Sequence, residues 1–227
     1  MTSKAIYGGV DPGDVPAYTL AEAATIVDVP KSTLQKWVKG RSFPTKNGVR
    51  CSEPIIFTPE PGFLSFTNIV EAHVLAALRR EKVALEKIRT AVHFVEHRLK
   101  IPHALAREKF QTDGVDVFVE RLETLINASR DGQCAIRQVI DEHLRRVEYD
   151  KGRVVRLFPL YRKEAPRVVV VDPRRAFGRP VLVGTSVPIA DIAARRRLGD
   201  TIRQLAQDYE VTPAEIKEAL RAVELAA

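Results

Sequence analysis

The sequence has few cysteines, no long apolar run and no apolar leader. Cys51 and Cys134 are the two cysteines among 227 residues, and neither belongs to a C-x-x-C pair. Two isolated cysteines cannot form a disulfide framework or a cysteine-rich zinc module. No segment approaches the roughly 18 apolar residues that a membrane helix needs, and residues 1–14 contain no stretch typical of a secretory signal. We therefore expect a protein of the reducing cytoplasm that does not interact with membranes.

Signatures of catalysis are scarce as well. The sequence contains neither a glycine-rich phosphate-binding loop nor a G-x-S-x-G nucleophile motif. The segment HFVEH matches the H-x-x-E-H pattern of a zinc peptidase class, in which His93 and His97 would bind zinc and Glu96 would act as the general base. These residues also fit the solvated face of a helix, which is the interpretation we favour. We predict a protein that is not an enzyme, with no catalytic residue, no metal and no cofactor.

The charge is positive overall and unevenly distributed. With 36 lysines and arginines against 29 aspartates and glutamates, the formal net charge is +7. Residues 67–110 and 151–227 are basic, whereas residues 111–150 carry nine acidic and five basic side chains. A basic balance favours polyanionic partners, because binding releases the counterions that surround a nucleic acid. The alternation indicates several structural units instead of one uniformly basic surface.

Turn signals mark two parts of the N-terminal half. Residues 1–17 are rich in glycine, proline and aspartate and are expected to form a mobile arm. Four prolines between residues 41 and 66 predict an extended, turn-rich hairpin region. The strand-like runs within it lie at 55–57 and 63–66.

A long helical pattern begins at Thr67 and ends before Pro102. Its second half has apolar residues at spacings of three and four, which define one helix face: Leu85, Ile88, Val92, Val95 and Leu99. The pattern lasts about two heptads, fewer than the three or four that indicate a coiled coil. The face is either a short dimer seam or the buried side of a globular helix.

The rest of the chain mixes strand and helix signals. Valine-rich and apolar runs predict a hairpin with strands at 116–120 and 124–128, and further strands at 153–162 and 167–172. Helical patterns are predicted at 131–148, 189–198, 201–209 and 212–225, with Thr201, Thr212 and Pro213 at helix starts.

Two short helices near the N-terminus, over 20–27 and 31–39, fit a helix-turn-helix. Such a motif needs a small residue where the helices cross and a tight turn, positions that Ala24 and Asp28 fill. The apolar residues that would dock the second helix are Leu34, Trp37 and Val38. The residues of its outer face have side chains that contact phosphates and base edges: Lys31, Ser32, Gln35, Lys36 and Lys39, followed by Arg41. A plain helical hairpin with a solvated lysine face is the alternative.

The segment TLQKWVKGRSF resembles the MerR-type winged helix, whose recognition helix typically reads Thr-Leu-Arg-Tyr-Trp followed by a glycine. Thr33, Leu34, Trp37 and Gly40 match that pattern, and Gln35 stands where an arginine is usual. The resemblance extends over residues 18–100, including the helical run after the wing. It implies a domain that binds operator DNA as a dimer, and the family's metal-sensing cysteines have no counterpart here.

The C-terminal segment 168–227 resembles a small bacterial domain that recurs in VapB-class antitoxins. Matching positions include Pro173, Gly178, Pro180, Gly184, Thr185, Val187, Pro188, Gly199, Tyr209 and Thr212, while Ser186 replaces the usual arginine. In the larger members this domain follows a helix-turn-helix domain and a middle segment, an arrangement that fits residues 18–227.

This second resemblance implies a PIN-domain ribonuclease toxin as partner, with a cluster of carboxylates that holds Mg²⁺. An antitoxin can neutralise such a site with a guanidinium group, which pairs with carboxylates through two hydrogen bonds. The candidate arginines for this contact are Arg174, Arg175, Arg179, Arg195, Arg196, Arg197 and Arg203. Each of them also fits an ordinary surface position.

These observations together predict a mostly helical α+β protein. It would contain an N-terminal winged helix-turn-helix (18–100), a central α/β hairpin segment (101–165) and a small C-terminal helical domain (166–227) for toxin binding and dimerisation. The predicted function is an antitoxin that represses its own operon as a homodimer. The alternative is a MerR-like, ligand-responsive transcription regulator with no toxin. Residues 201–220 also follow a helix-turn-helix pattern, so which of the two segments contacts bases stays open.

Overall fold

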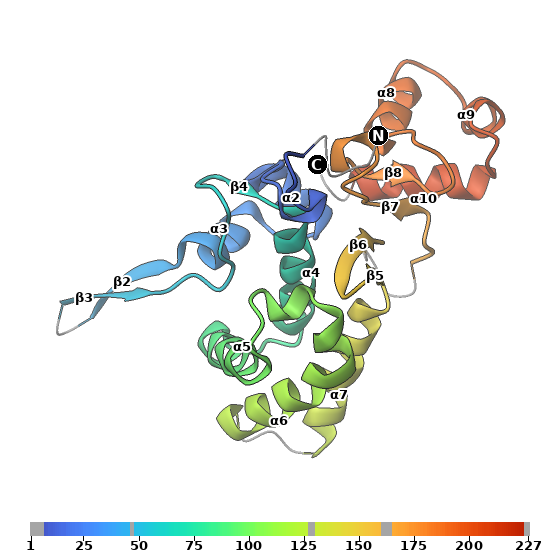
Figure 1. Cartoon of the computed structure of the whole chain (residues 1–227). Coiled ribbons are helices and arrows are strands. Elements are labelled where there is room, and N and C mark those ends of the chain that lie inside the picture. Colours follow the sequence, from blue (N-terminus) through green and yellow to red (C-terminus); the bar gives the residue numbers. More distant parts are fainter. Residues whose placement is uncertain (1–6, 46–47, 127–129, 160–164, 225–227) are drawn as a thin grey trace.

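The computed structural model describes residues 7–45, 48–126, 130–159 and 165–224. Helices form most of the body, and the described strands pair into four separate two-stranded antiparallel sheets (Figure 1). The mostly helical α+β class is thereby confirmed. Within the described ranges, no helix has the length and apolar character needed to span a membrane.

The N-terminal part forms a helix-turn-helix followed by a hairpin. Its elements are η1 (Pro12–Asp14), β1 (Tyr18–Thr19), α2 (Leu20–Ile26), α3 (Lys31–Lys39), β2 (Arg41–Thr45), β3 (Gly48–Ser52) and β4 (Phe63–Leu64). Thr19 followed three residues later by Glu22 is a sequence pattern that predicts a capping box, and helix α2 begins with one. The Thr19 N–H donates to Glu22 (2.8 Å), and the Thr19 hydroxyl accepts from the Glu22 N–H (3.3 Å). Strands β2 and β3 project away from the body (Figure 1).

The strand-like run at 55–57 is not a strand. Ile55 and Ile56 are buried, and both backbone N–H groups donate to the Trp37 carbonyl, at 2.8 and 3.1 Å. This segment therefore covers the inner side of α3. The ladder partner of β2 is instead the polar segment β3, whose strand character the sequence pattern did not reveal.

Helix α4 (Phe66–Arg80) runs through the centre of the molecule, and its residues 66–78 are all buried. The sequence pattern predicts Thr67 as the capping residue, but the cap is Ser65, and the Thr67 hydroxyl donates to Asp14 at 2.7 Å. Arg153 also pairs with Asp11 (2.9 Å). Residues 11–14 are thus packed against the body, in contrast to the mobile arm expected there.

Helix α5 (Leu85–Leu99) presents its apolar face to the interior. Ile88 and Val95 are fully buried, Val92 is nearly so, and the helix packs along α6. The predicted seam is therefore the buried side of a globular helix. The dimer-seam interpretation is wrong because the partner helix belongs to the same chain.

The hairpin predicted over 116–120 and 124–128 is wrong where the structure describes it. That segment is helix α6 (Val115–Ile126), preceded by η3 (Phe110–Gly114), and residues 127–128 lie outside the described residues. Val115, Phe118 and Leu122 recur at helical spacing and are buried against the central core. The valines suggested strands, but the spacing of the buried residues has the helical period.

Helix α7 (Arg130–Leu144) ends earlier than the predicted 148, because Val147 opens a hairpin. The hairpin consists of β5 (Val147–Asp150) and β6 (Arg153–Leu157), joined by a tight turn. The central segment thus contains two helices, α6 and α7, and one hairpin. The predicted strand 153–162 is confirmed up to Leu157, and residues 160–162 lie outside the described residues.

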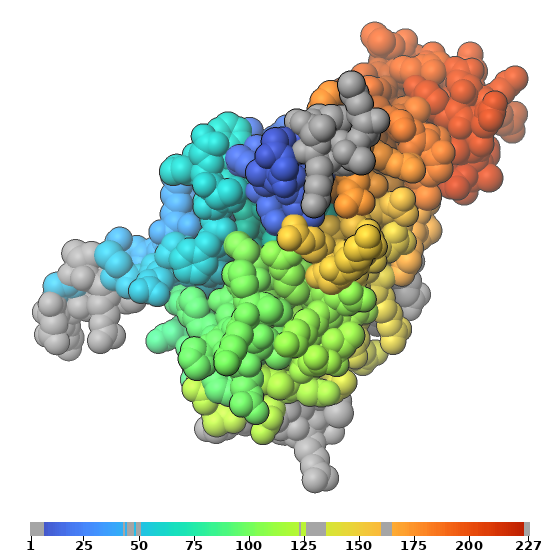
Figure 2. Space-filling model, viewed as in Figure 1, coloured from blue at the N-terminus to red at the C-terminus, as the bar shows by residue number. Residues whose placement is uncertain are grey.

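The C-terminal part has its own apolar core. Its elements are β7 (Val169–Val170), η4 (Ala176–Gly178), β8 (Val181–Leu182), α8 (Ile189–Arg197), α9 (Ile202–Asp208) and α10 (Pro213–Glu224). Apolar spacing in the sequence predicts a bundle core of Ile192, Leu198, Ile202, Leu205, Ile216 and Leu220. Ile192, Leu205 and Ile216 are buried together with Ala219, and Ile202 and Leu220 pack against them. The prediction is wrong for Leu198, which follows the last residue of α8 and is 87 % exposed. Figure 2 shows this part, in orange and red, as a lobe on the far side of the molecule from the β2–β3 hairpin.

Hydrogen bonds attach this lobe to the N-terminal part and to strand β6 of the central segment. The buried Tyr18 hydroxyl donates to the Gly178 carbonyl at 3.0 Å, and burial raises the pKa of Tyr18, so this hydroxyl keeps its proton. Leu157 and Val171 exchange two backbone hydrogen bonds, at 3.0 and 2.8 Å. The lobe is thus fixed to the remainder of the chain at specific points.

Candidate nucleic-acid interface and partner surface

Helix α3 divides into an inner and an outer face, as predicted. Leu34 and Trp37, which are 0 % and 1 % exposed, lie one turn apart on the inner face. All six predicted DNA-contacting residues have exposed side chains: Lys31, Ser32, Gln35, Lys36, Lys39 and Arg41. The structure therefore gathers these side chains on the solvent side of α3 and at the start of β2.

Gly40 joins α3 to the hairpin in a conformation that favours glycine. Its φ is +72°, and a Cβ atom there would lie 2.0 Å from the Ser52 carbonyl oxygen. The Arg41 N–H donates to the Ser52 hydroxyl at 3.0 Å on the other side of the junction. The close approach holds the base of the hairpin directly beside the last turn of α3.

The turn between α2 and α3 contains Asp28 at φ +53°, where such motifs often have glycine. Aspartate tolerates this left-handed conformation better than most residues. Its carboxylate accepts a hydrogen bond from Arg80 at 3.1 Å, at the end of α4. The ion pair fixes the turn to the central helix.

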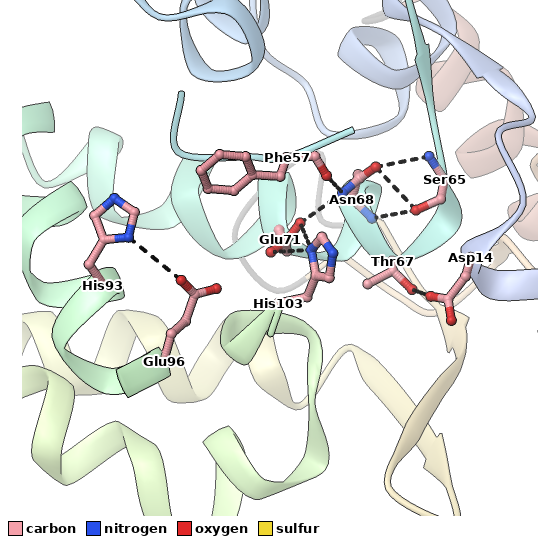
Figure 3. Close-up of polar contacts among 9 residues, drawn as sticks. All are labelled: Asp14, Phe57, Ser65, Thr67, Asn68, Glu71, His93, Glu96 and His103. Carbon is pink, nitrogen blue, oxygen red and sulfur yellow. Dashed lines mark hydrogen bonds and ion pairs between the residues drawn. The ribbon is translucent and has the colours of Figure 1, made fainter. Parts of the chain in front are cut away.

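A buried polar cluster at the N-terminal half of α4 was not predicted from the sequence (Figure 3). The Asn68 amide donates to the Phe57 carbonyl (3.0 Å) and to Glu71 (2.9 Å). Glu71 is 3 % exposed, and its carboxylate lies 3.1 Å from Nδ1 of His103. The cluster connects α4, the segment after β3 and the loop after α5. No local pattern marks it, because its members are far apart in the sequence.

The Glu71 contact raises the pKa of His103, mainly through its hydrogen bond, although burial and Arg107 act in the opposite direction and Glu96 assists. Since this folded-state pKa lies above the unfolded value near 6.5, the contribution of His103 to stability is complete below that pH. It is lost as the pH rises through the folded-state value.

We expect the difference in free energy of unfolding between the wild type and His103→Asn to shrink as the pH rises from about 6 to 9. Asparagine removes the titration and tolerates the left-handed backbone of residue 103, whose φ is +54°. Urea unfolding at several pH values measures this difference. Burial also lowers the pKa of His73 and of His143. Because both proteins contain these two histidines, their titration cancels in the difference. A difference that is independent of pH would contradict the prediction.

If the peptidase hypothesis held, the geometry around the H-x-x-E-H segment would show a cluster of zinc ligands. His93 Nδ1 lies 3.7 Å from Glu96, whereas His97 is exposed and contributes no contact to this pair. In the part of the chain that the structure describes, no three His, Cys, Asp or Glu side chains come together to hold a metal. The zinc hydrolase hypothesis therefore finds no support in the geometry.

The predicted toxin-contacting arginines separate into two groups. Arg195 contacts Asp200 and Asp208, each at 2.5 Å, and its guanidinium lies 5.3 Å from the centre of the Tyr209 ring. These contacts raise the pKa of Arg195, with Asp208 the largest cause. Arg195 thus joins α8 to α9. The other six predicted arginines form the second group, whose side chains are exposed: Arg174, Arg175, Arg179, Arg196, Arg197 and Arg203.

Two family models match separate parts of the chain. The model described as "Putative DNA-binding HTH domain" matches residues 16–92, which contain α2, α3, the hairpin and α4. The model described as "Protein of unknown function (DUF433)" matches residues 169–221, the C-terminal lobe. The chain is therefore a protein with an N-terminal DNA-binding-type helix-turn-helix domain and a distinct small C-terminal domain.

Proteins from Mycobacterium tuberculosis match most of the chain. The protein named "Putative antitoxin VapB45" is 34% identical, over 92% of this chain and 95% of its own length. "Uncharacterized protein Rv2308" is 24% identical, over 91% and 90%. The crystal structure of Rv2018 has 30% identity and a TM-score of 0.69, covering 91% of this chain and 98% of that one. The chain belongs to the VapB antitoxin family that VapB45 represents, and the resemblance noted in the sequence is confirmed.

Proposed function

We propose that this protein is a cytoplasmic antitoxin that inhibits a PIN-domain ribonuclease toxin and represses its own operon by binding operator DNA as a homodimer. Its family membership supports the antitoxin role. The observation that carries DNA binding is the exposed polar face of α3 beside the projecting β2–β3 hairpin. In this proposal the protein has no catalytic activity and requires no cofactor.

In the proposed DNA complex, α3 is the recognition helix and lies in the major groove. Lys31, Lys36 and Lys39 contact phosphates, while Ser32 and Gln35 face base edges. Arg41 and the hairpin contact the backbone next to that groove. Trp37 and Leu34 are buried behind the helix, so the polar face is presented on a rigid support.

The proposed dimer uses a surface other than the apolar face of α5, since that face packs within one chain. A two-fold dimer presents two copies of α3. The operator is then expected to contain inverted half-sites about 34–36 Å apart, or a multiple of that distance. Footprinting on promoter DNA measures this spacing.

The proposed domain roles follow the sequence division. Residues 18–100 bind DNA, residues 101–165 connect the two ends and assist dimerisation, and residues 166–227 bind the toxin. Within the last range, the exposed arginines are the candidates for the toxin's carboxylates. Arg195 instead stabilises the α8–α9 junction.

A ligand-responsive regulator without a toxin is the second candidate function. The observation that favours it is a hollow of about 360 Å³ beside the end of α5. The hollow is lined by Phe57, Glu96, Lys100, Ile101, Pro102 and His103. An effector bound there would contact the polar cluster that supports the DNA-binding domain.

Affinity purification of the tagged full chain from its own cells, followed by mass spectrometry, distinguishes the two functions. A stoichiometric PIN-domain protein, whose ribonuclease activity the purified chain inhibits, is the result that we expect. A chain that binds its promoter DNA with no protein partner and responds to a metabolite would support the second function.

Substituting Lys36 or Lys39 by alanine is expected to weaken DNA binding uniformly across sequences. Each substitution should lower the slope of log affinity against log salt by about 1, because each removes one phosphate contact. Gel-shift titrations at several salt concentrations measure the slope. Lys217→Ala, an exposed lysine of α10, is the matched control and should leave the slope unchanged. Equal slopes for all variants would contradict the phosphate role.

A further inference from the structure

The C-terminal domain carries an aromatic side chain, that of Phe177, which is largely exposed to solvent. Phe177 is 87 % exposed, and among the described large apolar side chains only Leu198 is equally exposed. Single exposed apolar residues are common and need no explanation by themselves. The backbone of Phe177, however, shows that its position is specified by the fold.

Three successive residues of the loop between β7 and β8 have left-handed backbones. Ala176, Phe177 and Gly178 have φ values of +47°, +56° and +76°. Positive φ is uncommon for residues other than glycine and is an outlier for bulky side chains. Such a conformation persists only where the surroundings enforce it, and it gathers at functional sites.

One hydrogen bond from the N-terminal domain and two within the loop hold this conformation. The Gly178 carbonyl accepts the buried hydrogen bond of the Tyr18 hydroxyl, and the Gly178 N–H donates to the Arg175 carbonyl at 2.8 Å. The Arg179 N–H donates to the Ala176 carbonyl at 3.1 Å. The loop is thus a turn closed by hydrogen bonds, on which the Phe177 side chain is exposed to solvent.

Three arginines lie within three residues of Phe177 in the sequence. Arg174, Arg175 and Arg179 are exposed, and with Phe177 they form what we call the Phe177 patch. The nearby Asp172 is 5 % exposed, and it already accepts hydrogen bonds from Arg156 (3.3 Å) and from the Arg174 N–H (2.9 Å), with Arg175 3.9 Å away. The exposed members of the patch are thus one aromatic residue and three basic residues, while the neighbouring carboxylate of Asp172 is buried.

An aromatic centre with an arginine rim is the composition of a protein-binding hot spot. Aromatic residues and arginine are enriched in interfaces, and central anchors fill pockets from which water is excluded. Single-stranded nucleic acid is instead bound by several aromatic platforms along a groove, and this patch has one ring. Its complement is a protein surface with an apolar pocket bordered by carboxylates.

We propose that the Phe177 patch is the anchor by which this protein holds its ribonuclease toxin, with the ring inserted into an apolar pocket that has an acidic rim. The inference rests on the proposed function and adds an aromatic anchor to the arginines considered from the sequence. Hydrogen bonds already hold the loop backbone, so less backbone entropy is lost on binding.

The test uses the full chain and the PIN-domain protein that co-purifies with the wild type, prepared separately and titrated by calorimetry. We expect Phe177→Ala and Phe177→Asn to weaken the affinity about 30-fold or more, as for a hot-spot residue. Asparagine is included because it tolerates the left-handed backbone. Leu198→Ala is the matched control, with the same exposure in the same domain, and should bind as the wild type does.

Arg174→Glu tests the rim, since Arg174 contacts Asp172 through its backbone N–H and not through its side chain. We expect weaker binding and a smaller loss of affinity with added salt. Thermal melting of all variants at the wild-type temperature would confirm that the domain remains folded.

Three outcomes would overturn the inference. Toxin affinity unchanged in both Phe177 variants would refute the anchor and leave the proposed function intact. A Phe177 variant that loses RNA binding or self-association, but not toxin binding, would assign the patch to those partners. Failure of the wild-type chain to bind any PIN-domain protein would refute the proposed function together with this inference.

Discussion

Replacing Trp37 by alanine is expected to lower the free energy of unfolding by about 3–5 kcal/mol, because it removes a fully buried aromatic side chain from the helix-turn-helix. The ring lies on the buried face of α3. The Trp37 carbonyl accepts hydrogen bonds from the backbone N–H groups of Ile55 and Ile56. Loss of the ring should therefore loosen both α3 and its covering segment. DNA binding is expected to be lost as well.

Urea unfolding followed by far-UV circular dichroism measures this effect, since Trp37 is the only tryptophan and its fluorescence disappears with the substitution. Gln35→Ala is the matched control, because Gln35 is exposed on the other face of the same helix. It should change stability by less than about 0.5 kcal/mol. A urea unfolding curve of Trp37→Ala equal to that of the wild type would contradict the assigned position of the ring.

Gly178→Ala is expected to destabilise the protein by about 3 kcal/mol, from left-handed strain and a broken buried hydrogen bond. The φ of Gly178 is +76°, and a Cβ atom would lie 2.0 Å from the Tyr18 hydroxyl oxygen. For a chain of this size, that loss corresponds to a decrease in melting temperature of roughly 6–12 °C. Differential scanning calorimetry measures the shift.

Gly152→Ala separates the two causes. Gly152 has φ +79°, but an added Cβ would meet nothing within 4 Å. This control carries the backbone strain without the clash, so its loss should be about 1–2 kcal/mol. If both variants melted at the same temperature, the contact between Tyr18 and Gly178 would contribute nothing to stability.

Local signals explain which elements were predictable. The capping residue Thr19, the inner residues Leu34 and Trp37, and the helical spacing of the C-terminal lobe all act within a few residues of each other, and the structure confirms them. The polar face of α3 follows from the same periodicity. Its contact with DNA stays a prediction.

Elements that depend on distant partners were not predictable. The segment from Val115 to Ile126 has β-branched residues typical of strands, but burial against α5 and α7 selects the helix. Strand β3 is polar and forms only because β2 pairs with it. The pair of Glu71 and His103 joins residues 32 positions apart, and no sequence period links them.

The apolar face of α5 shows a different limit. Its spacing predicts burial correctly, yet a spacing cannot say whether the covering helix belongs to the same chain or to a second copy. The exposure of Phe177 has the same origin. Whether an aromatic residue lies inside or outside depends on the loop geometry that Tyr18 and Gly178 impose.

The hydrogen bond between Tyr18 and Gly178 also has a consequence for synthesis on the ribosome. Its partners are separated by 160 residues. At about 5–20 residues per second, roughly 8–32 s pass between the emergence of the two sides. During that interval the nascent N-terminal domain exposes the surface that the C-terminal lobe later covers. Until the lobe is synthesised, water can hydrogen-bond to the Tyr18 hydroxyl. This surface is therefore less prone to aggregate than a purely apolar one.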